Sequence, residues 1–234
     1  MMSIICVYNN KDILEKYLLS SIATQTVDVE VVLVDNRDNK YTSAASALNS
    51  GAERAHGKYL VFSHQDINLN VDTWVEDTVD LLETLDNVGI VGVAGKIDDS
   101  LVYSNILQGI PPRDVTPYKL DGVEHASTVD ECLMIIPRSV FMDNHFDEVT
   151  CPDWHLYGVD YVLSIKKKSY EAYLIPSMLE HASPGDSMSE AYYTTLAKLQ
   201  RKHLKNRLIR TCMGDWFTFI PVSLQKIIKK VKKY

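Results

Sequence analysis

Three apolar runs in the first third of the chain each end in polar side chains. They cover residues 3–10, 29–36 and 58–66, and each closes on Asp or Asn. β-Branched and aromatic residues fill the third run up to the polar residues 64–66, which is typical of a buried strand. The segments between the runs have helical spacing, so we expect parallel strands whose polar ends gather on one edge of a sheet, where a ligand binds. The alternative is that Asp and Asn only cap turns.

The rest of the pattern predicts further elements of an α/β protein. Residues 96–127 contain proline, charge and little periodicity, so we expect an irregular excursion of the kind that supplies binding residues. The strand that follows it is entered through two acids, Asp130 and Glu131. Expected helices cover residues 13–22, 44–55, 71–85, 138–142 and 161–168, and expected strands cover residues 88–95, 129–137 and 170–175.

Charge divides the chain into two parts. The net charge is −7, but beyond residue 200 ten Lys and Arg accompany one Asp, so the tail carries +9 and the rest −16. We therefore expect a domain over residues 1–200 and a basic amphipathic helical tail over residues 201–234. The acidic body excludes nucleic acid as a partner.

The last part of the tail has the pattern of an amphipathic helix. Four apolar residues repeat at helical spacing beside lysines: Leu224, Ile227, Ile228 and Val231. This pattern fits a helix lying in an anionic membrane interface, and it fits equally a terminal helix packed on the domain.

Cysteine usage and hydropathy favour a cytoplasmic protein. The four cysteines form no Cys-x-x-Cys pair, which favours free thiols in a reducing compartment. No stretch reaches the roughly 20 apolar residues that a membrane span needs. We expect a cytoplasmic location, with the tail able to reach the inner face of the cell membrane.

Seven short segments carry a resemblance to a known family. They are Val7-Tyr8-Asn9, Val34-Asp35-Asn36, Ala55-x-Gly57-x-Tyr59, His64-Gln65-Asp66, Phe146-Asp147-Glu148, His155-x-Tyr157-x-x-Asp160 and His181-x-Ser183-x-Gly185. In the order and spacing of these segments, the chain resembles the bacterial family 2-like glycosyltransferases of the GT-A fold. The resemblance implies a Rossmann-like, mostly parallel central sheet flanked by helices, followed here by a C-terminal helical tail.

The resemblance implies a nucleoside-diphosphate sugar at the polar edge of the sheet. In such enzymes the ends of the first two strands hold the nucleoside, which assigns Val7, Tyr8, Asn9 and Asp35 to the ribose and base. An ionised carboxylate only accepts hydrogen bonds, so Asp35 suits a base with an N–H donor, such as uracil, and we expect a UDP-sugar. A turn-stabilising role is the alternative for Asp35.

The resemblance also implies a divalent cation. The family's third strand ends in Asp-x-Asp, where this chain has His64, Gln65 and Asp66. Asp66 is then the acidic ligand, with His64 or Gln65 in the place of its partner, and we place Gln65 among the donor-binding residues. Diphosphate oxygens would complete the coordination of Mn²⁺ or Mg²⁺. His181 matches a later His of the family's metal site, and an imidazole favours Mn²⁺.

Sugar transfer with inversion needs a general base that takes the proton of the acceptor hydroxyl. The family's Glu-Asp pair at a helix start corresponds to residues 158–160, so the resemblance makes Asp160 the expected base, although the Glu is missing. Asp130 and Glu131 are further candidates, and an N-cap role is the alternative for Asp160. Nearby aromatic side chains either stack on sugar rings or belong to the core: Trp154, His155 and Tyr157.

Together these expectations describe a metal-dependent, inverting glycosyltransferase. It would move a sugar from a nucleoside-diphosphate donor to a glycan or lipid-linked acceptor in cell-surface polysaccharide synthesis. A nucleotidyltransferase would need a Gly-rich basic loop after the first strand, and residues 8–11 do not form one. A catalytically silent nucleotide- or glycan-binding module, derived from a transferase, fits the missing acids but has no need of Asp66, Asp160 and His181 together.

Overall fold

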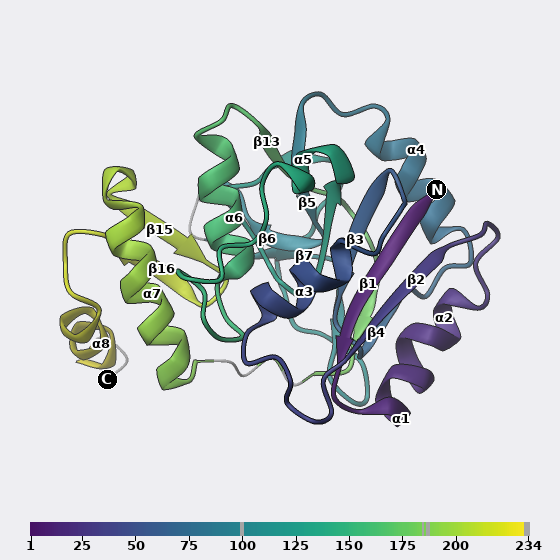
Figure 1. The fold of residues 1–234 in the computed structure, drawn as a ribbon. Helices are drawn as coiled ribbons and strands as arrows, with labels where there is room; N and C mark the ends of the chain where they lie inside the picture. Colours follow the sequence, from purple (N-terminus) through teal and green to yellow (C-terminus); the bar gives the residue numbers. More distant parts are fainter. Residues whose placement is uncertain (99–100, 184, 186–187, 232–234) are drawn as a thin grey trace.

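A mixed sheet with most of its strands in one direction forms the centre of the protein (Figure 1). The computed structural model describes residues 1–98, 101–183, 185 and 188–231. Within them the central sheet has the order β10 (Glu124–His125), β13 (Glu171–Leu174), β5 (Val88–Gly92), β12 (Leu133–Pro137), β3 (Tyr59–Ser63), β1 (Met2–Tyr8) and β2 (Glu30–Asp35). Of these strands, β12 and β10 run against the others. The expected α/β class, with a mostly parallel sheet flanked by helices, is confirmed.

The first three strands are arranged as the sequence predicts. Strand β1 pairs in parallel with both β2 and β3, so their carboxyl ends share one edge. The first crossover runs through α1 (Lys11–Leu14), a π-helical turn η1 (Glu15–Leu19) and α2 (Ser20–Ile22). The second is α3 (Ala44–Ala52), which lies very close to β1: a Cβ added at Gly51 would be 2.6 Å from Cγ2 of Ile5.

Strand β12 runs antiparallel to β3, and this direction shapes the functional edge. The segment between β5 and β12 stays at the carboxyl edge of the sheet, so the chain re-enters there and runs backwards. Leu133 pairs with Ser63, the last residue of β3. The residues that precede β12, Asp130 and Glu131, therefore lie beside the residues that follow β3. The strand begins at Leu133, because Thr128 and Val129 form a separate strand, β11.

The expected irregular excursion contributes short strands to two small sheets, which strands from other parts of the chain complete. One has the order β11 (Thr128–Val129), β6 (Ala94–Lys96) and β7 (Tyr103–Ser104). The other has the order β4 (Ile67–Asn68), β14 (Glu180–His181), β8 (Leu107–Gln108) and β9 (Arg113–Asp114). In the second sheet His181 pairs with Ile67. This pairing carries a residue from late in the sequence to the end of β3.

Helices cover both faces of the central sheet and enclose two apolar cores. Successive residues of β1 point to opposite faces: Ile5 packs in one core, while Ile4 and Cys6 pack in the other. One face is covered by α3, α5 (Arg138–Met142), α6 (Tyr157–Lys166) and α7 (Glu190–Lys202), and the other by α1, η1 and α4 (Trp74–Leu82). Helix α6 begins four residues before the predicted start, because Leu156 adopts a left-handed backbone with φ 65° just before it.

The segment after α7 is a hairpin followed by a helix, rather than a helix throughout. A short turn, η2 (Leu204–Asn206), leads into β15 (Leu208–Thr211), β16 (Gly214–Phe217) and α8 (Val222–Val231). Ile209 and Trp216 are fully buried with the residues of the main core, which the polar sequence around them does not reveal. The expected boundary at residue 200 falls inside α7, and the division into two domains stays a prediction. No helix in the described part of the chain is long and apolar enough to cross a membrane.

Candidate active site

A cavity of about 400 Å³ opens at the carboxyl edge of β1 and β3. Of the residues predicted to bind the donor or the metal, it gathers Val7, Tyr8, Asn9, Gln65 and Asp66. Residues without a predicted role also line it, namely Asn36, Asn39 and Ser63, and so does Glu131, a further candidate for the base. The edge that the three apolar runs predict is therefore a hollow lined by polar groups.

Gln65 fixes the loop between β1 and the first helix. Its side-chain oxygen accepts hydrogen bonds from the backbone N–H groups of Asn9 at 3.1 Å and Asn10 at 3.0 Å. Its amide nitrogen donates to the side-chain oxygen of Asn9 at 2.8 Å. The side chain of Asn10 in turn accepts from the N–H of Ile13 and caps the helix. Gln65 thus holds the wall of the cavity, whereas its predicted contact with the donor is untested.

Asp35 lies beside this cavity, next to Tyr8, rather than in its lining. The two residues are paired across β1 and β2, and a hydrogen bond from Tyr8 to Asp35 raises the pKa of the phenol. Arg37 binds the carboxylate with both Nε and an Nη, the latter at 2.6 Å from Oδ2. These hydrogen bonds hold the pKa of Asp35 well below its usual range. Asp35 is therefore a fixed anion at the rim.

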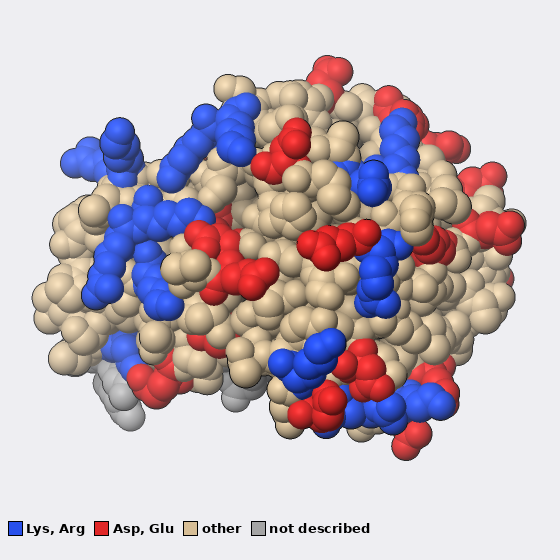
Figure 2. Space-filling model, viewed as in Figure 1, with Lys and Arg blue, Asp and Glu red and all other residues tan. Residues whose placement is uncertain are grey.

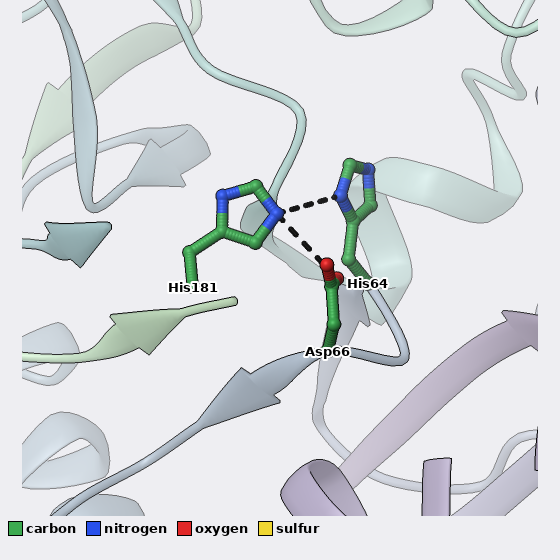
Figure 3. Close-up of side chains that lie close together, drawn as sticks. All are labelled: His64, Asp66 and His181. Carbon is green, nitrogen blue, oxygen red and sulfur yellow. Dashed lines mark hydrogen bonds and ion pairs between the residues drawn. The ribbon is translucent and has the colours of Figure 1, made fainter. Parts of the chain in front are cut away.

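His64, Asp66 and His181 converge on one point at the cavity (Figure 3). Nε2 of His181 lies 3.4 Å from Oδ1 of Asp66 and 3.4 Å from Nδ1 of His64. One nitrogen or oxygen atom from each of the three side chains lies within 4.8 Å of the others. The close-up shows His64 and Asp66 leaving the chain just after β3, while His181 comes from β14. His181 is nine-tenths buried, which restricts its rotamers.

The electrostatics of this trio favour a cation between the side chains. Burial and the neighbouring His181 lower the pKa of His64, so this imidazole is kept neutral and able to offer a lone pair. Burial opposes ionisation of Asp66, but the hydrogen bond and charge of His181 outweigh it and lower the pKa of the carboxyl. Two imidazole nitrogens and one carboxylate oxygen are a donor set that suits Mn²⁺ better than Mg²⁺. The residues present therefore fit the implied divalent cation.

Glu131 ties the start of α6 to the cavity. Its carboxylate accepts hydrogen bonds from the N–H of Gly158 at 2.8 Å and the N–H of Leu156 at 3.2 Å. Burial raises the pKa of Glu131 to about 8, and these N–H groups only partly oppose the rise. A helix N-terminus leaves such N–H groups without partners inside the helix, and Glu131 supplies the missing acceptor.

A second cavity of about 360 Å³ adjoins the first. The two share His64, Glu131, Trp154 and Ser183, so these residues form the boundary between them. Aromatic and polar side chains from α7 and the hairpin β15–β16 complete the second cavity, and Asp130 lines it. Burial, followed by the charge of Asp130 and hydrogen bonds to it, raises the pKa values of the Cys132 and Cys212 thiols well above their usual range.

The aromatic residues near α6 divide between lining and core. Trp154 is 41% exposed and borders both cavities, so it is available to a ligand. Tyr157 is buried and packs edge-on against Phe146, with ring centres 5.3 Å apart, while it also lines the first cavity. His155 lines the second cavity and exchanges a hydrogen bond with Ser189 at 2.9 Å.

Asp160 does not lie where a general base is needed. Its carboxylate is almost fully buried, 2.6 Å from Nζ of Lys202 and 2.7 Å from Nε2 of His203. Among the described residues it lines neither of the two cavities, because it faces the end of α7 on the other side of α6. The position before it, Val159, is the one that faces the second cavity. The expectation that Asp160 is the base does not fit this placement, which instead joins α6 to α7.

Sequence patterns indicate only some of these site residues. Asp130 and Glu131 stand out as paired acids before a strand, but their place at the cavity depends on β12 running antiparallel. Asn36 and Ser63 follow or end strands β2 and β3 and belong to the same edge. A rule that takes every polar residue at a strand end would have found both.

Comparisons with known proteins agree with this geometry. Residues 2–107 match the sequence model of a family described as glycosyltransferase-like. No curated protein matches the chain. Similar solved structures include the mannosyltransferase PcManGT from Pyrobaculum calidifontis in complex with GDP-Man and Mn²⁺, with 15% identity and a TM-score of 0.60. The structure of TarS residues 1–349 from S. aureus has 16% identity and a TM-score of 0.59. The structure of GalNAc-T7 with UDP, GalNAc and Mn²⁺ has 13% identity and a TM-score of 0.62.

These matches extend over most of this chain but over less than two thirds of each of the other proteins. They cover 87%, 86% and 86% of this chain, and 64%, 64% and 47% of PcManGT, TarS 1–349 and GalNAc-T7. At 13–16% identity the likeness establishes the fold. The chain has the GT-A fold of glycosyltransferases, and the match over residues 2–107 confirms its resemblance to the family 2-like glycosyltransferases.

Proposed function

We propose that this chain is a metal-dependent, inverting glycosyltransferase that uses a nucleoside-diphosphate sugar, with UDP as the nucleotide. The observation that carries the proposal is the convergence of His64, Asp66 and His181 where the two cavities meet: Asp66 lines the first, His181 the second and His64 both. Solved structures of the same fold contain Mn²⁺ with GDP-Man or with UDP. Those ligands belong to the other proteins and support the assignment by analogy of fold.

The donor would lie across the first cavity. The nucleoside would rest against Val7, Tyr8 and Asn9, where Asp35, fixed by Arg37, still has lone pairs to accept a hydrogen bond from the base. The diphosphate would lie near His64, Asp66 and His181. A divalent cation held by these three side chains would neutralise charge on the leaving nucleoside diphosphate.

Asp130 is the base that this geometry favours. In an inverting transfer the acceptor oxygen bonds to the anomeric carbon, the bond from that carbon to the diphosphate oxygen breaks, and the hydroxyl proton goes to a carboxylate. Asp130 lines the second cavity. The Glu of the family pattern is missing from this chain, at Gly158. Glu131 already accepts backbone N–H groups with both oxygens, so we assign it the positioning of α6.

The acceptor would enter the second cavity. Trp154 is 41% exposed and offers an aromatic face of the kind that packs against sugar rings, and Ser183 offers a hydroxyl group. We propose a glycan or lipid-linked acceptor, used in cell-surface polysaccharide synthesis. The proposed place of reaction is the cytoplasm, at the inner face of the cell membrane.

Thermal unfolding with nucleotides tests this function. A ligand that binds only the folded state raises the unfolding temperature, so the full chain is heated with UDP, GDP, dTDP or CMP, each with and without Mn²⁺. We expect stabilisation by UDP that depends on Mn²⁺, and slow release of UDP from a UDP-sugar, because water replaces the acceptor. No stabilisation by any of the four nucleotides would refute the proposal.

One observation favours a second candidate, a silent nucleotide-binding module. Asp160 is locked in a buried ion pair and the family's Glu is missing at Gly158, so the family's catalytic pair is not available at the second cavity. Such a module would be stabilised by UDP with Mn²⁺ but would release no UDP from a range of UDP-sugars. Nucleotide release that depends on Asp130 would exclude it.

A further inference from the structure

Helix α8 is attached to the protein by Val222, which is buried in the main core at its start, and beyond that by charged and polar side chains. Nζ of Lys226 pairs with Glu190 at 2.7 Å and lies 3.8 Å from the ring centre of Tyr193. Nζ of Lys229 lies 4.1 Å from the ring centre of Trp216. Both lysines therefore face α7 and the hairpin, where cation–π contacts hold them. This is the reverse of a usual surface helix, which turns its charges to the solvent.

Buried amides strengthen the same attachment. Gln225 accepts a hydrogen bond from the N–H of Phe217 at 2.9 Å and donates to the carbonyl of Ile220 at 2.7 Å. Gln200, from α7, donates to the carbonyls of Phe217 at 2.7 Å and Ile220 at 3.0 Å. The segment between β16 and α8 is thus held from two sides, and the orientation of the helix is fixed.

The apolar face of α8 consequently points outward. Leu224, Ile227 and Ile228, at positions i, i+3 and i+4, are 48%, 60% and 42% exposed. Phe217 and Phe219, which precede the helix, are 46% and 65% exposed, with ring centres 5.4 Å apart. We call these five residues the apolar ridge. Large apolar side chains gathered in this way mark an interaction surface.

Basic residues flank the apolar ridge. Arg201, Lys205 and Arg207 are exposed at the end of α7 and in the turn after it. The carbonyl of Arg207 accepts a hydrogen bond from the N–H of Thr218, which lies between the two phenylalanines of the ridge. Figure 2 shows Lys and Arg side chains gathered on the side of the molecule where α7 and the hairpin lie in Figure 1.

We propose that the apolar ridge docks onto an anionic lipid bilayer. Leucine, isoleucine and phenylalanine side chains would enter the boundary of the acyl chains, while the flanking Arg and Lys meet anionic headgroups. A second copy of the chain fits the surface less well. In a twofold contact the same patch meets itself, so the basic flanks of the two copies would repel each other.

The position of the ridge relates membrane binding to the proposed acceptor cavity. Helix α7 contributes Tyr193 to the attachment of α8 and Tyr192 to the second cavity. The hairpin contributes Phe217 to the ridge and Thr211 to the same cavity. The use of this surface to present a lipid-linked acceptor rests on the proposed function, whereas binding to the bilayer does not.

Vesicle sedimentation of the full chain tests the inference. Neutral phosphatidylcholine vesicles are compared with vesicles containing phosphatidylglycerol, and we expect strong binding to the anionic vesicles only. Ile227→Glu places a negative charge in the ridge and should weaken this binding about tenfold or more. The isoleucine side chain is no longer buried in the bilayer, and the anionic headgroups repel the new carboxylate. Val71→Glu is the matched control. Val71 is 46% exposed and just precedes α4, a helix that lies far from α8 in Figure 1, so this variant should bind as the wild type does.

Each result decides between the possibilities. Equal binding of wild type and Ile227→Glu, or no binding of the wild type to anionic vesicles, would overturn the proposal. A dimer that light scattering detects and that Ile227→Glu separates, without vesicle binding, would assign the ridge to a second copy. Ile227→Ser provides a milder variant if the charged one fails to fold. Release of UDP from a UDP-sugar without vesicles is measured in parallel, so a failure of the proposed function is recognised separately.

Discussion

Replacement of Glu131 should change both the stability of the protein and its dependence on pH. The carboxylate accepts hydrogen bonds from Gly158 and Leu156 at the start of α6, and Ala at this position would leave both N–H groups without an acceptor. A buried donor without a partner costs about 1–3 kcal/mol. The cavity admits water to this site, so we expect Glu131→Ala to lower the free energy of unfolding by about 2–4 kcal/mol. For a chain of this length that corresponds to a fall in melting temperature on the order of 5–15 °C.

The variant Glu131→Gln isolates the effect of the charge. Burial raises the pKa of Glu131 to about 8 from the ordinary value of 4.5, so between these values the folded protein holds a proton that the unfolded chain has lost. In that window the free energy of unfolding falls as the pH rises, and above pH 8 the loss is complete. Glutamine carries no titratable group and removes this contribution. We therefore expect the stability of the wild type to fall relative to Glu131→Gln by about 3–4 kcal/mol between pH 5 and pH 8.

Denaturant unfolding at pH 5, 6, 7 and 8 measures both effects. The difference between the wild type and Glu131→Gln is the informative quantity, because other titrating groups contribute equally to both proteins. A difference that stays constant from pH 5 to pH 8 would show that Glu131 is already ionised in the folded protein. That result would refute the reasoning from burial and would return Glu131 to the candidates for the general base.

Two further predictions concern carboxylates with contrasting surroundings. Asp130→Asn should lower kcat for sugar transfer about 10²–10⁴-fold with little change in melting temperature. Asp160→Asn breaks a buried ion pair with Lys202 and His203, so it should lower the free energy of unfolding by about 3 kcal/mol or more and leave kcat within a few fold. The opposite pattern in calorimetry and steady-state kinetics would restore Asp160 as the base. Hydrogen bonds from His56 and Ser3 lower the pKa of Glu30 to about 2, so its stabilising effect is present above pH 4.5 and is lost as the pH falls through 2. Glu30→Gln should therefore be less stable than the wild type at pH 7 by about 1–3 kcal/mol and nearly equal to it at pH 2, and a constant difference in denaturant unfolding would contradict this.

Local patterns were sufficient for the elements that follow one another at the N-terminus. The alternation of apolar strands and small-residue helices predicts β1, β2 and β3 in parallel, and Gly51 beside Ile5 shows why small residues were needed in α3. Polar residues at the strand ends then fall on one edge by geometry alone. The predicted positions of Tyr8, Asn9, Gln65 and Asp66 at one cavity follow from this.

Residues whose place depends on long-range pairing were not predictable in the same way. Asp130 reaches the site because β12 reverses direction, and no local pattern indicates that reversal. Asp160 lies on the far side of α6 because the helix begins at Tyr157 and because Lys202, far along the chain, pairs with the carboxylate. The hairpin β15–β16 is a short, partly polar segment whose burial of Trp216 comes from α7.

Resemblance to a family supplied what the residues alone did not. His181 reaches the end of β3 because its strand, β14, pairs with β4. Both strands are too short for the apolar pattern to predict them. His181 was assigned to the metal only because related enzymes have a His at the same point in the order of motifs. The structure brings it to 3.4 Å from Asp66, and adds His64 to the same group.

Direct measurement of Mn²⁺ binding tests the central claim most closely. Electron paramagnetic resonance follows the free Mn²⁺ signal as the full chain is added, with and without UDP. The wild type is compared with His181→Ala and with the control His56→Ala. The imidazole of His56 pairs with Glu30 away from the cavities, so its removal leaves the proposed metal site intact. We predict that the wild type and His56→Ala bind Mn²⁺ more tightly with UDP than without it, and that His181→Ala loses most of this binding. Equal Mn²⁺ binding by the wild type and His181→Ala would contradict the assignment of His64, Asp66 and His181 as the metal site.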